Sequence, residues 1–226
     1  MRLGVLFSGG KDSAFACWKA MQKEEVVCLI TIVSRNPESY MFHTPNIRLA
    51  ALQAESAGLP LLEMETEGEK ETELLDLRGA LLAARERFGI EGLVTGAILS
   101  VYQATRLQRV CYELGLWCFN PLWLADQDEY MEELLDAGFR VIITGVFASP
   151  FDGSWLGREI DRRTLDELRM IAREHRITLT GEGGEFETFV IDAPFFSRRV
   201  AIEEGSRVYR NHNGVFRIER AGLVAR

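Results

Sequence analysis

The segment that most constrains this chain is the loop Ser8–Ser13, with the sequence SGGKDS, which lies between two apolar patterns. Arg2–Phe7 predicts a short strand, and Ser13–Lys23 has the spacing of a helix. A strand, a glycine loop and a helix start point several backbone N–H groups at one place, and the helix dipole adds to their attraction for phosphates. Glycine allows close approach and positive φ. The sequence therefore predicts a phosphate-binding loop at this junction.

Counting excludes the two best-known phosphate loops. A Walker A loop needs a glycine where this chain has Val5, and a Ser or Thr where it has Asp12. The dinucleotide pattern G-x-G-x-x-G is also absent. The remaining pattern resembles the pyrophosphate loop of the N-type ATP pyrophosphatases, which cleave ATP between its α- and β-phosphates and adenylate a substrate. The resemblance implies that the loop binds ATP.

Composition limits the class of protein. A chain of 226 residues fits one large α/β domain, or one domain with a smaller appendage, and its 47% hydrophobic content is ordinary for a soluble protein. No segment is long and apolar enough to cross a membrane, and the chain enters a strand at once, so neither a membrane anchor nor a signal peptide is expected. A net charge of −8 argues against broad nucleic-acid binding. Whether the chain forms a homo-oligomer is left open.

The four cysteines show no C-x-x-C pairing. Cys17 and Cys28 lie in apolar stretches, which favours buried side chains. Absence of a disulfide pattern indicates a reducing, cytoplasmic compartment.

Strand-like and helix-like segments alternate up to residue 147. The predicted strands are Arg2–Phe7, Val26–Ser34, Leu61–Met64, Gly92–Ile98 and Phe139–Phe147. The predicted helices are Ser13–Lys23, Asn46–Ala57 with Asn46 as its cap, Lys70–Phe88, Val101–Leu114 and Glu129–Ala137. Leu116–Trp123 is predicted to be an apolar link. The alternation predicts an α/β fold with a doubly wound, parallel, five-stranded sheet and right-handed crossovers.

After Ala148 the pattern changes to one amphipathic helix and several short strands. The helix is Asp161–Glu174, and the strand-like runs are Thr188–Ile191, Val200–Glu203, Arg207–Arg210 and Val215–Glu219. Asn213-Gly214 predicts a hairpin turn. We therefore expect an ATP-binding domain over residues 1–148, a smaller substrate-binding α+β domain over residues 149–226, and an active cleft between them.

In doubly wound sheets, ligands bind where the strand order reverses. The resemblance implies the order 3-2-1-4-5, which places the SGGKDS loop opposite Gly96 and Ala97 after the fourth strand. Gly96 has two explanations of equal weight, close approach of a nucleotide or helix packing. Ser34 and His43 are further candidate nucleotide contacts, although a lone loop histidine such as His43 is as often exposed or structural.

A second motif, GEGGEFET, covers Gly181–Thr188 and holds three carboxylates and three glycines. It is either a solvated acidic turn or a site where glycines let backbone and carboxylates surround a ligand. If Glu185–Thr188 is extended, Glu185 and Glu187 point to the same face.

SGGKDS and EGGEFET together resemble the diphthine–ammonia ligase (diphthamide synthetase) family, a branch of the N-type ATP pyrophosphatases with a HUP-like nucleotide fold. The segment Tyr40–His43, the segment Gly96–Ser100 with Tyr102, Gln103 and Arg106, and the segment from Gly115 to Trp123 also fit. The resemblance covers most of residues 1–195.

The family's reaction amidates the diphthine carboxylate of translation elongation factor 2 with ammonia, converting ATP to AMP and pyrophosphate. The resemblance therefore implies ATP and Mg²⁺ as cofactors, and elongation factor 2 and ammonia as partners. Ser8, Gly9, Gly10 and Ser13 would bind phosphate, Lys11 would supply positive charge and Asp12 would hold Mg²⁺. The implied acceptor site comprises Tyr102, Gln103, Arg106, Glu182, Gly183, Gly184, Glu185, Phe186, Glu187 and Thr188. The implied catalytic residues are Lys11, Asp12, Glu185 and Glu187.

The carboxylates of GEGGEFET have two candidate roles. With Phe186 or Trp155 they could form a cage for the quaternary ammonium group of the acceptor. They could instead bind ammonium and take its proton, and the sequence does not separate these roles.

Three other functions remain open from the sequence. The same chemistry could act on another carboxylate, such as a corrinoid-like small molecule. RNA thiolation, which related pyrophosphatases perform, is disfavoured by the acidic charge and the lack of cysteine pairs. A nucleotide-binding module without catalysis is disfavoured by the intact Lys11, Asp12 and GEGGEFET carboxylates.

Overall fold

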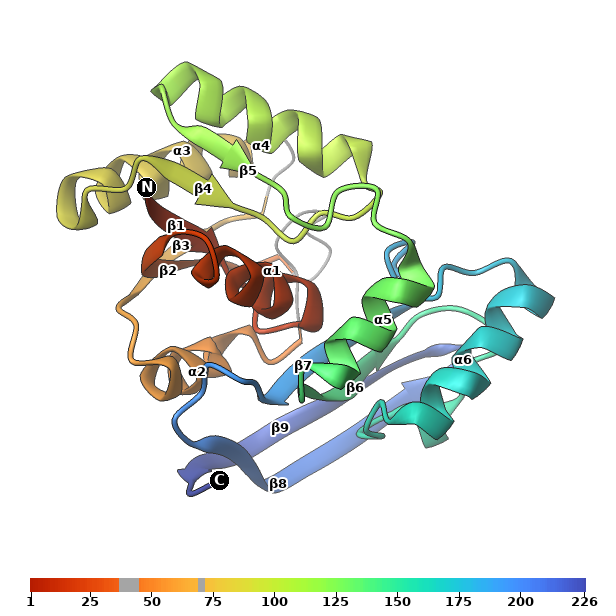
Figure 1. Cartoon of the computed structure of the whole chain (residues 1–226). Helices are drawn as coiled ribbons and strands as arrows, with labels where there is room; N and C mark the ends of the chain where they lie inside the picture. Colours follow the sequence, from red (N-terminus) through yellow and green to blue (C-terminus); the bar gives the residue numbers. More distant parts are fainter. Residues whose placement is uncertain (37–44, 69–71) are drawn as a thin grey trace.

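The computed structural model describes residues 1–36, 45–68 and 72–226, and the chain forms two sheets that lie beside each other (Figure 1). The first sheet is parallel throughout, with the order β3-β2-β1-β4-β5. Its strands are β1 (Arg2–Leu6), β2 (Glu25–Ser34), β3 (Leu61–Thr66), β4 (Gly92–Val94) and β5 (Trp117–Phe119). The expected doubly wound, five-stranded parallel sheet with the order 3-2-1-4-5 is confirmed.

The identity of its fifth strand was predicted wrongly. β5 (Trp117–Phe119) pairs with β4 and lies in the segment that the sequence assigned to a link. The predicted fifth strand is β6 (Arg140–Val146), which pairs antiparallel with strands of the second sheet. Its long β-branched pattern fits a buried strand of either sheet, so the pattern alone could not assign it. Because β6 belongs to the second sheet, a domain boundary before residue 148 is favoured. The position of this boundary stays a prediction.

Helices cover both faces of the first sheet (Figure 1). They are α1 (Lys11–Met21), α2 (Ala50–Ala57) after the 3₁₀ turn η1 (Ile47–Leu49), α3 (Thr72–Phe88) and α4 (Val101–Leu114). Apolar residues of α1 and α2 join one buried core, and those of α3 and α4 join another. This division is what right-handed crossovers on both sides of a parallel sheet produce.

The second sheet is antiparallel, with the order β7-β6-β9-β8. Besides β6, its strands are β7 (Phe186–Asp192), β8 (Arg199–Arg210) and β9 (Asn213–Val224). The same part of the chain contains the helices α5 (Gln127–Asp136) and α6 (Arg162–His175) and the 3₁₀ turn η2 (Gly153–Trp155). The four short runs predicted after residue 187 are thus three strands. The hairpin turn lies at Asn211-His212, with φ of 49° and 60°, and not at Asn213-Gly214, because Arg210 pairs with Asn213.

An aromatic cluster joins the two sheets through α1. The ring of Phe15 lies 5.2 Å from that of Tyr130 and 5.4 Å from that of Phe139, between centroids. The same core continues into Phe189 and Val190 of β7. The core therefore fixes the start of α1, where SGGKDS lies, against the second sheet.

Two smaller expectations have different outcomes. Asn46 does not cap the following helix; its side chain instead bonds to the backbone of Phe216 and Ile218 in β9. Cys17 and Cys28 are fully buried, as expected, and all four cysteines are free.

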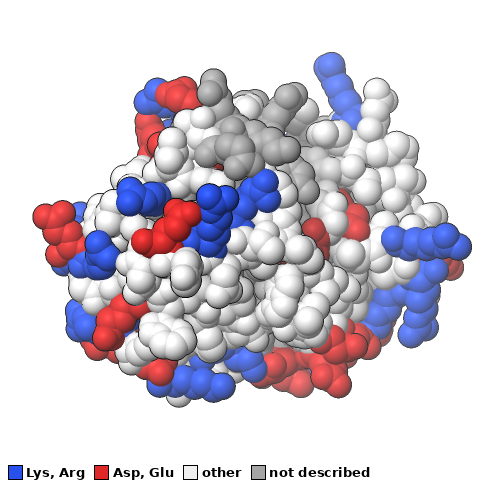
Figure 2. Space-filling model, turned by 90° about the horizontal axis from the view of Figure 1, so that it is seen from above, with Lys and Arg blue, Asp and Glu red and all other residues white. Residues whose placement is uncertain are grey.

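Over the part of the chain that the structure describes, no helix has the length and apolarity needed to span a membrane. Figure 2 shows acidic and basic side chains in small, interspersed groups on the face seen from above.

Candidate active site

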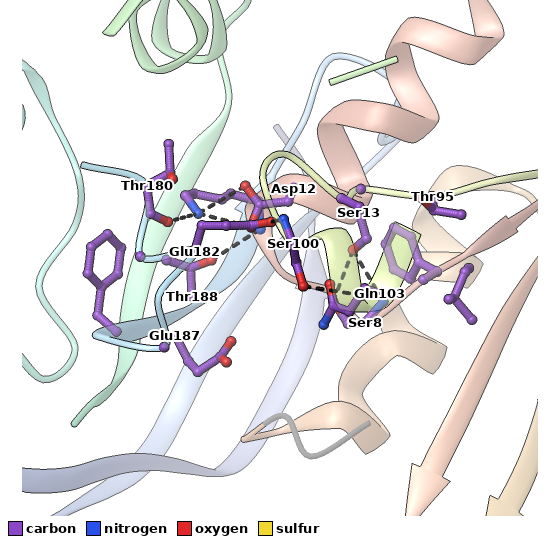
Figure 3. A pocket seen from close by; sticks show the side chains of 18 of the residues that line it. Ser8, Asp12, Ser13, Thr95, Ser100, Gln103, Thr180, Glu182, Glu187 and Thr188 are labelled. Carbon is purple, nitrogen blue, oxygen red and sulfur yellow. Dashed lines mark hydrogen bonds and ion pairs between the residues drawn. The ribbon is translucent and has the colours of Figure 1, made fainter. Parts of the chain in front are cut away.

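A cavity of about 360 Å³ opens at the carboxyl ends of β1 and β4, where the strand order of the first sheet reverses (Figure 3). Its walls come from the SGGKDS loop, the loop after β4, the first turn of α4 and the GEGGEFET loop. The predicted site residues that line it are Ser8, Lys11, Asp12, Ser13, Gly96, Ala97, Gln103, Glu182, Gly183, Gly184, Phe186, Glu187 and Thr188. Two motifs far apart in the sequence thus form one cavity.

Several predicted site residues do not line this cavity. They are Gly9, Gly10, Ser34, Tyr102, Arg106 and Glu185. Arg106 lines a separate groove between α3 and α4, with its guanidinium 3.5 Å from the ring centroid of Tyr102. The side chain of Ser34 bonds to the backbone of Asn36. His43 lies outside the described residues.

Gly9 and Gly10 form the base of the SGGKDS loop. Gly9 has φ of +79°, and its carbonyl accepts from the backbone N–H of Val190 at 2.9 Å and from Nε2 of Gln53 at 3.0 Å. A Cβ on Gly9 would lie 2.4 Å from Oε1 of Gln53. The backbone of Gly9 is therefore held by β7 and α2, on the side away from the cavity.

Two hydroxyls face each other across the top of the loop. Oγ of Ser8 and Oγ of Ser13 lie 3.1 Å apart, and the Ser13 hydroxyl donates to the carbonyl of Gly10 at 3.1 Å. These hydroxyls lie at the cavity wall near the N-terminus of α1, where the helix dipole favours an anion.

The structure supports helix packing as one reason for Gly96. A Cβ at this position would lie 2.7 Å from the carbonyl carbon of Asp12 and 2.8 Å from the backbone nitrogen of Ser13. Gly96 therefore permits close packing of the loop after β4 against the first turn of α1.

Lys11 joins the two motifs. Its side chain is 2% exposed, and Nζ donates to both carboxylate oxygens of Asp12, at 3.0 and 2.9 Å, and to the carbonyl of Thr180. Its backbone N–H donates to Oγ1 of Thr188 at 3.1 Å, and the ring centroid of Phe186 lies 5.6 Å from Nζ. The ammonium group thus neutralises Asp12 at the contact between SGGKDS and GEGGEFET.

Two residues of α5 that support this contact were not predicted from the sequence. The hydroxyl of Tyr130 donates to Oδ1 of Asp12 at 2.8 Å, and Oε1 of Gln127 accepts from the N–H and the hydroxyl of Thr180 at 3.2 and 3.1 Å. Burial, and then the nearby Asp12 carboxylate, hold the pKa of Tyr130 well above its usual value, so the hydroxyl keeps its proton. The two residues are three apart on one helix, a spacing too common in sequences to mark a site.

Replacing Tyr130 with phenylalanine tests this support. The variant loses one hydrogen bond to a carboxylate, worth about 1.5–3 kcal/mol, so we expect the ATP turnover that the resemblance implies to fall about 10-fold or more. Tyr112→Phe is the control, because Tyr112 is 84% exposed on α4. Equal turnover in Tyr130→Phe and wild type would show that Asp12 does not need this hydrogen bond.

Three of the four carboxylates at the site have fixed partners. Asp12 binds Lys11 and Tyr130. Oε1 of Glu182 accepts from the N–H groups of Ile98, Leu99 and Ser100 at 3.0, 3.0 and 3.1 Å, directly before α4. The carboxylate of Glu185 accepts from the N–H and the hydroxyl of Thr178 at 2.6 and 2.8 Å.

Glu185 and Glu187 were expected on one face only if Glu185–Thr188 is extended, and this condition is not met. β7 begins at Phe186, so Glu185 precedes the extended segment, and its carboxylate turns away from the cavity toward Thr178. Glu185 therefore stabilises the GEGGEFET loop through Thr178, on the side away from the cavity.

Glu187 is the fourth carboxylate and lines the cavity from β7. Among the described residues its oxygens form no hydrogen bond or ion pair, and no dashed line reaches it in Figure 3. Burial, opposed by the charge of Lys11 and reinforced by the charges of Asp12 and Glu182, raises the pKa of Glu187 to about 7.

This raised pKa predicts an unusual pH dependence of stability. The folded chain holds the Glu187 proton up to about pH 7, whereas the unfolded chain loses it near pH 4.5, so folding stability falls between these values. Glu187→Gln should therefore unfold like wild type at pH 4 and be more stable at pH 8, by up to about 3 kcal/mol. Urea unfolding at both pH values measures this, with Glu86→Gln on the exposed surface of α3 as the control. A stability difference independent of pH would contradict the raised pKa.

Comparison with known proteins places the chain in a family. Residues 1–118 match the diphthamide synthase N-terminal domain, and residues 126–224 match the diphthamide synthase C-terminal domain. The chain therefore belongs to the diphthamide synthase family, and the resemblance inferred from SGGKDS and EGGEFET is confirmed.

Several curated relatives are named diphthine–ammonia ligase. The chain is 30% identical to that of Bos taurus over 231 residues, covering 92% of this chain and 85% of the relative. It is 32% identical to that of Danio rerio over 222 residues, covering 90% and 87%. A solved structure described as a predicted subunit of tRNA methyltransferase from Methanocaldococcus jannaschii is 18% identical, with a TM-score of 0.46 over 85% of this chain and 98% of that chain. That likeness is too remote to bear on function.

Proposed function

We propose that this protein uses ATP and ammonia to amidate the diphthine carboxylate of elongation factor 2, through an acyl-adenylate, with release of AMP and pyrophosphate. The main support for this proposal is that SGGKDS and GEGGEFET enclose one cavity in a chain of the diphthamide synthase family. The name of the relatives, diphthine–ammonia ligase, supports this acceptor and nucleophile.

In this proposal, ATP occupies the side of the cavity formed by the SGGKDS loop. ATP would lie against Ser8, Ser13 and the first turn of α1, where hydroxyls and the helix dipole favour phosphates. The acceptor carboxylate would then attack the α-phosphorus, and pyrophosphate would leave. Holding the reactants in line is the main contribution of such a site, because no covalent intermediate with the protein is required.

Mg²⁺ fits this site only as a partner of the nucleotide. No group of three or more His, Cys, Asp or Glu side chains in the described ranges could hold a metal by itself. Asp12 is 29% exposed and lines the cavity, and Mg²⁺ commonly takes one or two carboxylates together with substrate phosphates and water. When bound, the ion would neutralise charge on the departing pyrophosphate, and Asp12 would be its ligand from this chain.

The test uses purified protein, ammonium, γ-labelled ATP and elongation factor 2 that carries diphthine. We expect the label in pyrophosphate and, by mass spectrometry of the modified peptide, conversion of the carboxylate to the amide. Label in orthophosphate, with no pyrophosphatase present, would contradict the proposed cleavage. Turnover with small carboxylates such as corrinoid precursors, and none with elongation factor 2, would contradict the acceptor. Nucleotide binding without turnover would contradict catalysis.

A further inference from the structure

The structure separates the roles of the site carboxylates, which the sequence leaves open. A group that takes a proton from a substrate must reach the cavity, and it can turn toward the substrate most freely when no protein donor holds either oxygen. Both oxygens of Asp12 accept from Lys11 and one also from Tyr130, and Glu182 is held in place through Oε1 by three backbone N–H groups. Glu185 is directed away from the cavity. Only Glu187, among the carboxylates described at this site, combines access to the cavity with no protein partner.

We propose that Glu187 is the catalytic base of the amidation step and accepts a proton from ammonium bound in the cavity. This inference rests on the proposed function and adds the group that makes ammonia nucleophilic. Near neutral pH most ammonia is present as ammonium, which has no lone pair for attack.

The surroundings of Glu187 suit this role. The charged groups that face it are Lys11 and Asp12 of α1 and Glu182 of the GEGGEFET loop, a net negative set that attracts a small cation. Burial and these two carboxylates bring the pKa of Glu187 to about 7, where a base is half ionised at neutral pH. Lys11 is already bound to Asp12 and the Thr180 carbonyl, so it does not form an ion pair with Glu187.

The Glu187 carboxylate takes one proton from ammonium and becomes a carboxylic acid. The ammonia that remains attacks the carbonyl carbon of the acyl-adenylate, a C–N bond forms, and the C–O bond to AMP breaks with its electron pair on the phosphate oxygen. The new C–NH₃⁺ group and the Glu187 carboxylic acid then each lose a proton to solvent, which leaves the amide and restores the carboxylate.

Hydroxylamine provides the matched control nucleophile, because it is largely uncharged at neutral pH and needs no base to free its lone pair. For Glu187→Gln we expect the ratio of amide formed from ammonium to hydroxamate formed from hydroxylamine to fall about 100-fold, the scale of general base catalysis. Glu86→Gln should leave the ratio unchanged, since Glu86 is exposed on α3. An unchanged ratio in Glu187→Gln would overturn the assignment.

A second measurement needs no variant. In wild type, kcat/KM for total ammonia should rise toward about pH 7 and then level off as Glu187 becomes fully ionised. If free ammonia were captured without a base, kcat/KM would continue to rise about tenfold per pH unit toward the pKa of ammonium, and this result would overturn the inference.

Acceptor-dependent exchange of labelled pyrophosphate into ATP, measured on wild type, separates this inference from the proposed function. Absence of exchange in wild type would overturn the proposed function. Normal exchange combined with an unchanged nucleophile ratio in Glu187→Gln would overturn only the role of Glu187.

Discussion

Lys11→Met is expected to lower pyrophosphate release by about 1000-fold, because it removes the fixed positive charge that organises the site. In wild type the ammonium group of Lys11 lies between the carboxylate of Asp12 and the carbonyl of Thr180. Without it, the hydroxyl of Tyr130 is the one donor left to Asp12 among the described residues, and the buried carbonyl of Thr180 loses its donor. The connection between the SGGKDS and GEGGEFET loops is weakened at the same time.

The same substitution should also destabilise the fold. Breaking a buried ion pair by removing one partner costs about 3–5 kcal/mol, and the partial exposure of Asp12 reduces this to about 2–3 kcal/mol here. Urea unfolding and pyrophosphate exchange on one preparation measure both effects, with Lys23→Met, an exposed position, as the control. Pyrophosphate exchange within a few-fold of wild type would show that the charge of Lys11 has no role in forming the acyl-adenylate.

Gly96→Ala is expected to lower ATP affinity by about 100-fold, because it displaces the backbone that forms the start of α1. The new Cβ would lie 2.7 Å from the carbonyl carbon of Asp12, and this neighbour is backbone and cannot rotate away. Overpacking of this kind costs about 1–3 kcal/mol, and about 2.7 kcal/mol corresponds to a 100-fold change in affinity. Calorimetric titration with ATP and thermal unfolding measure the two effects.

Gly79→Ala is the matched control for this substitution. Gly79 lies within α3, and a Cβ there would meet only Sδ of Met64, at 3.7 Å. Alanine is the better helix former by about 0.5–1 kcal/mol, so this variant should be as stable as wild type or more stable. If Gly96→Ala bound ATP as tightly as Gly79→Ala, the close packing at Gly96 would not matter to the nucleotide site.

The sequence by itself determined the elements that depend on local patterns. The SGGKDS loop, its preceding strand and α1 follow from a short apolar run, two glycines and helical spacing, all within residues 1–24. Gly58 and Gly115 end α2 and α4 in the left-handed conformation, and such a helix end is set by a few neighbouring residues. The family could be inferred for the same reason, since each motif is contiguous.

Only the tertiary structure decided which elements and side chains meet. The three residues of β5 complete the parallel sheet because of their pairing with β4, although the pattern of Phe139–Phe147 is the stronger strand signal. Tyr130 reaches Asp12 across 118 positions of sequence, and Lys11 reaches Thr180 across 169. Such contacts depend on how the two sheets pack, and no local pattern encodes that packing. The same physical reason explains why four similar carboxylates in the sequence become three with fixed partners and one, Glu187, that has no partner among the described residues.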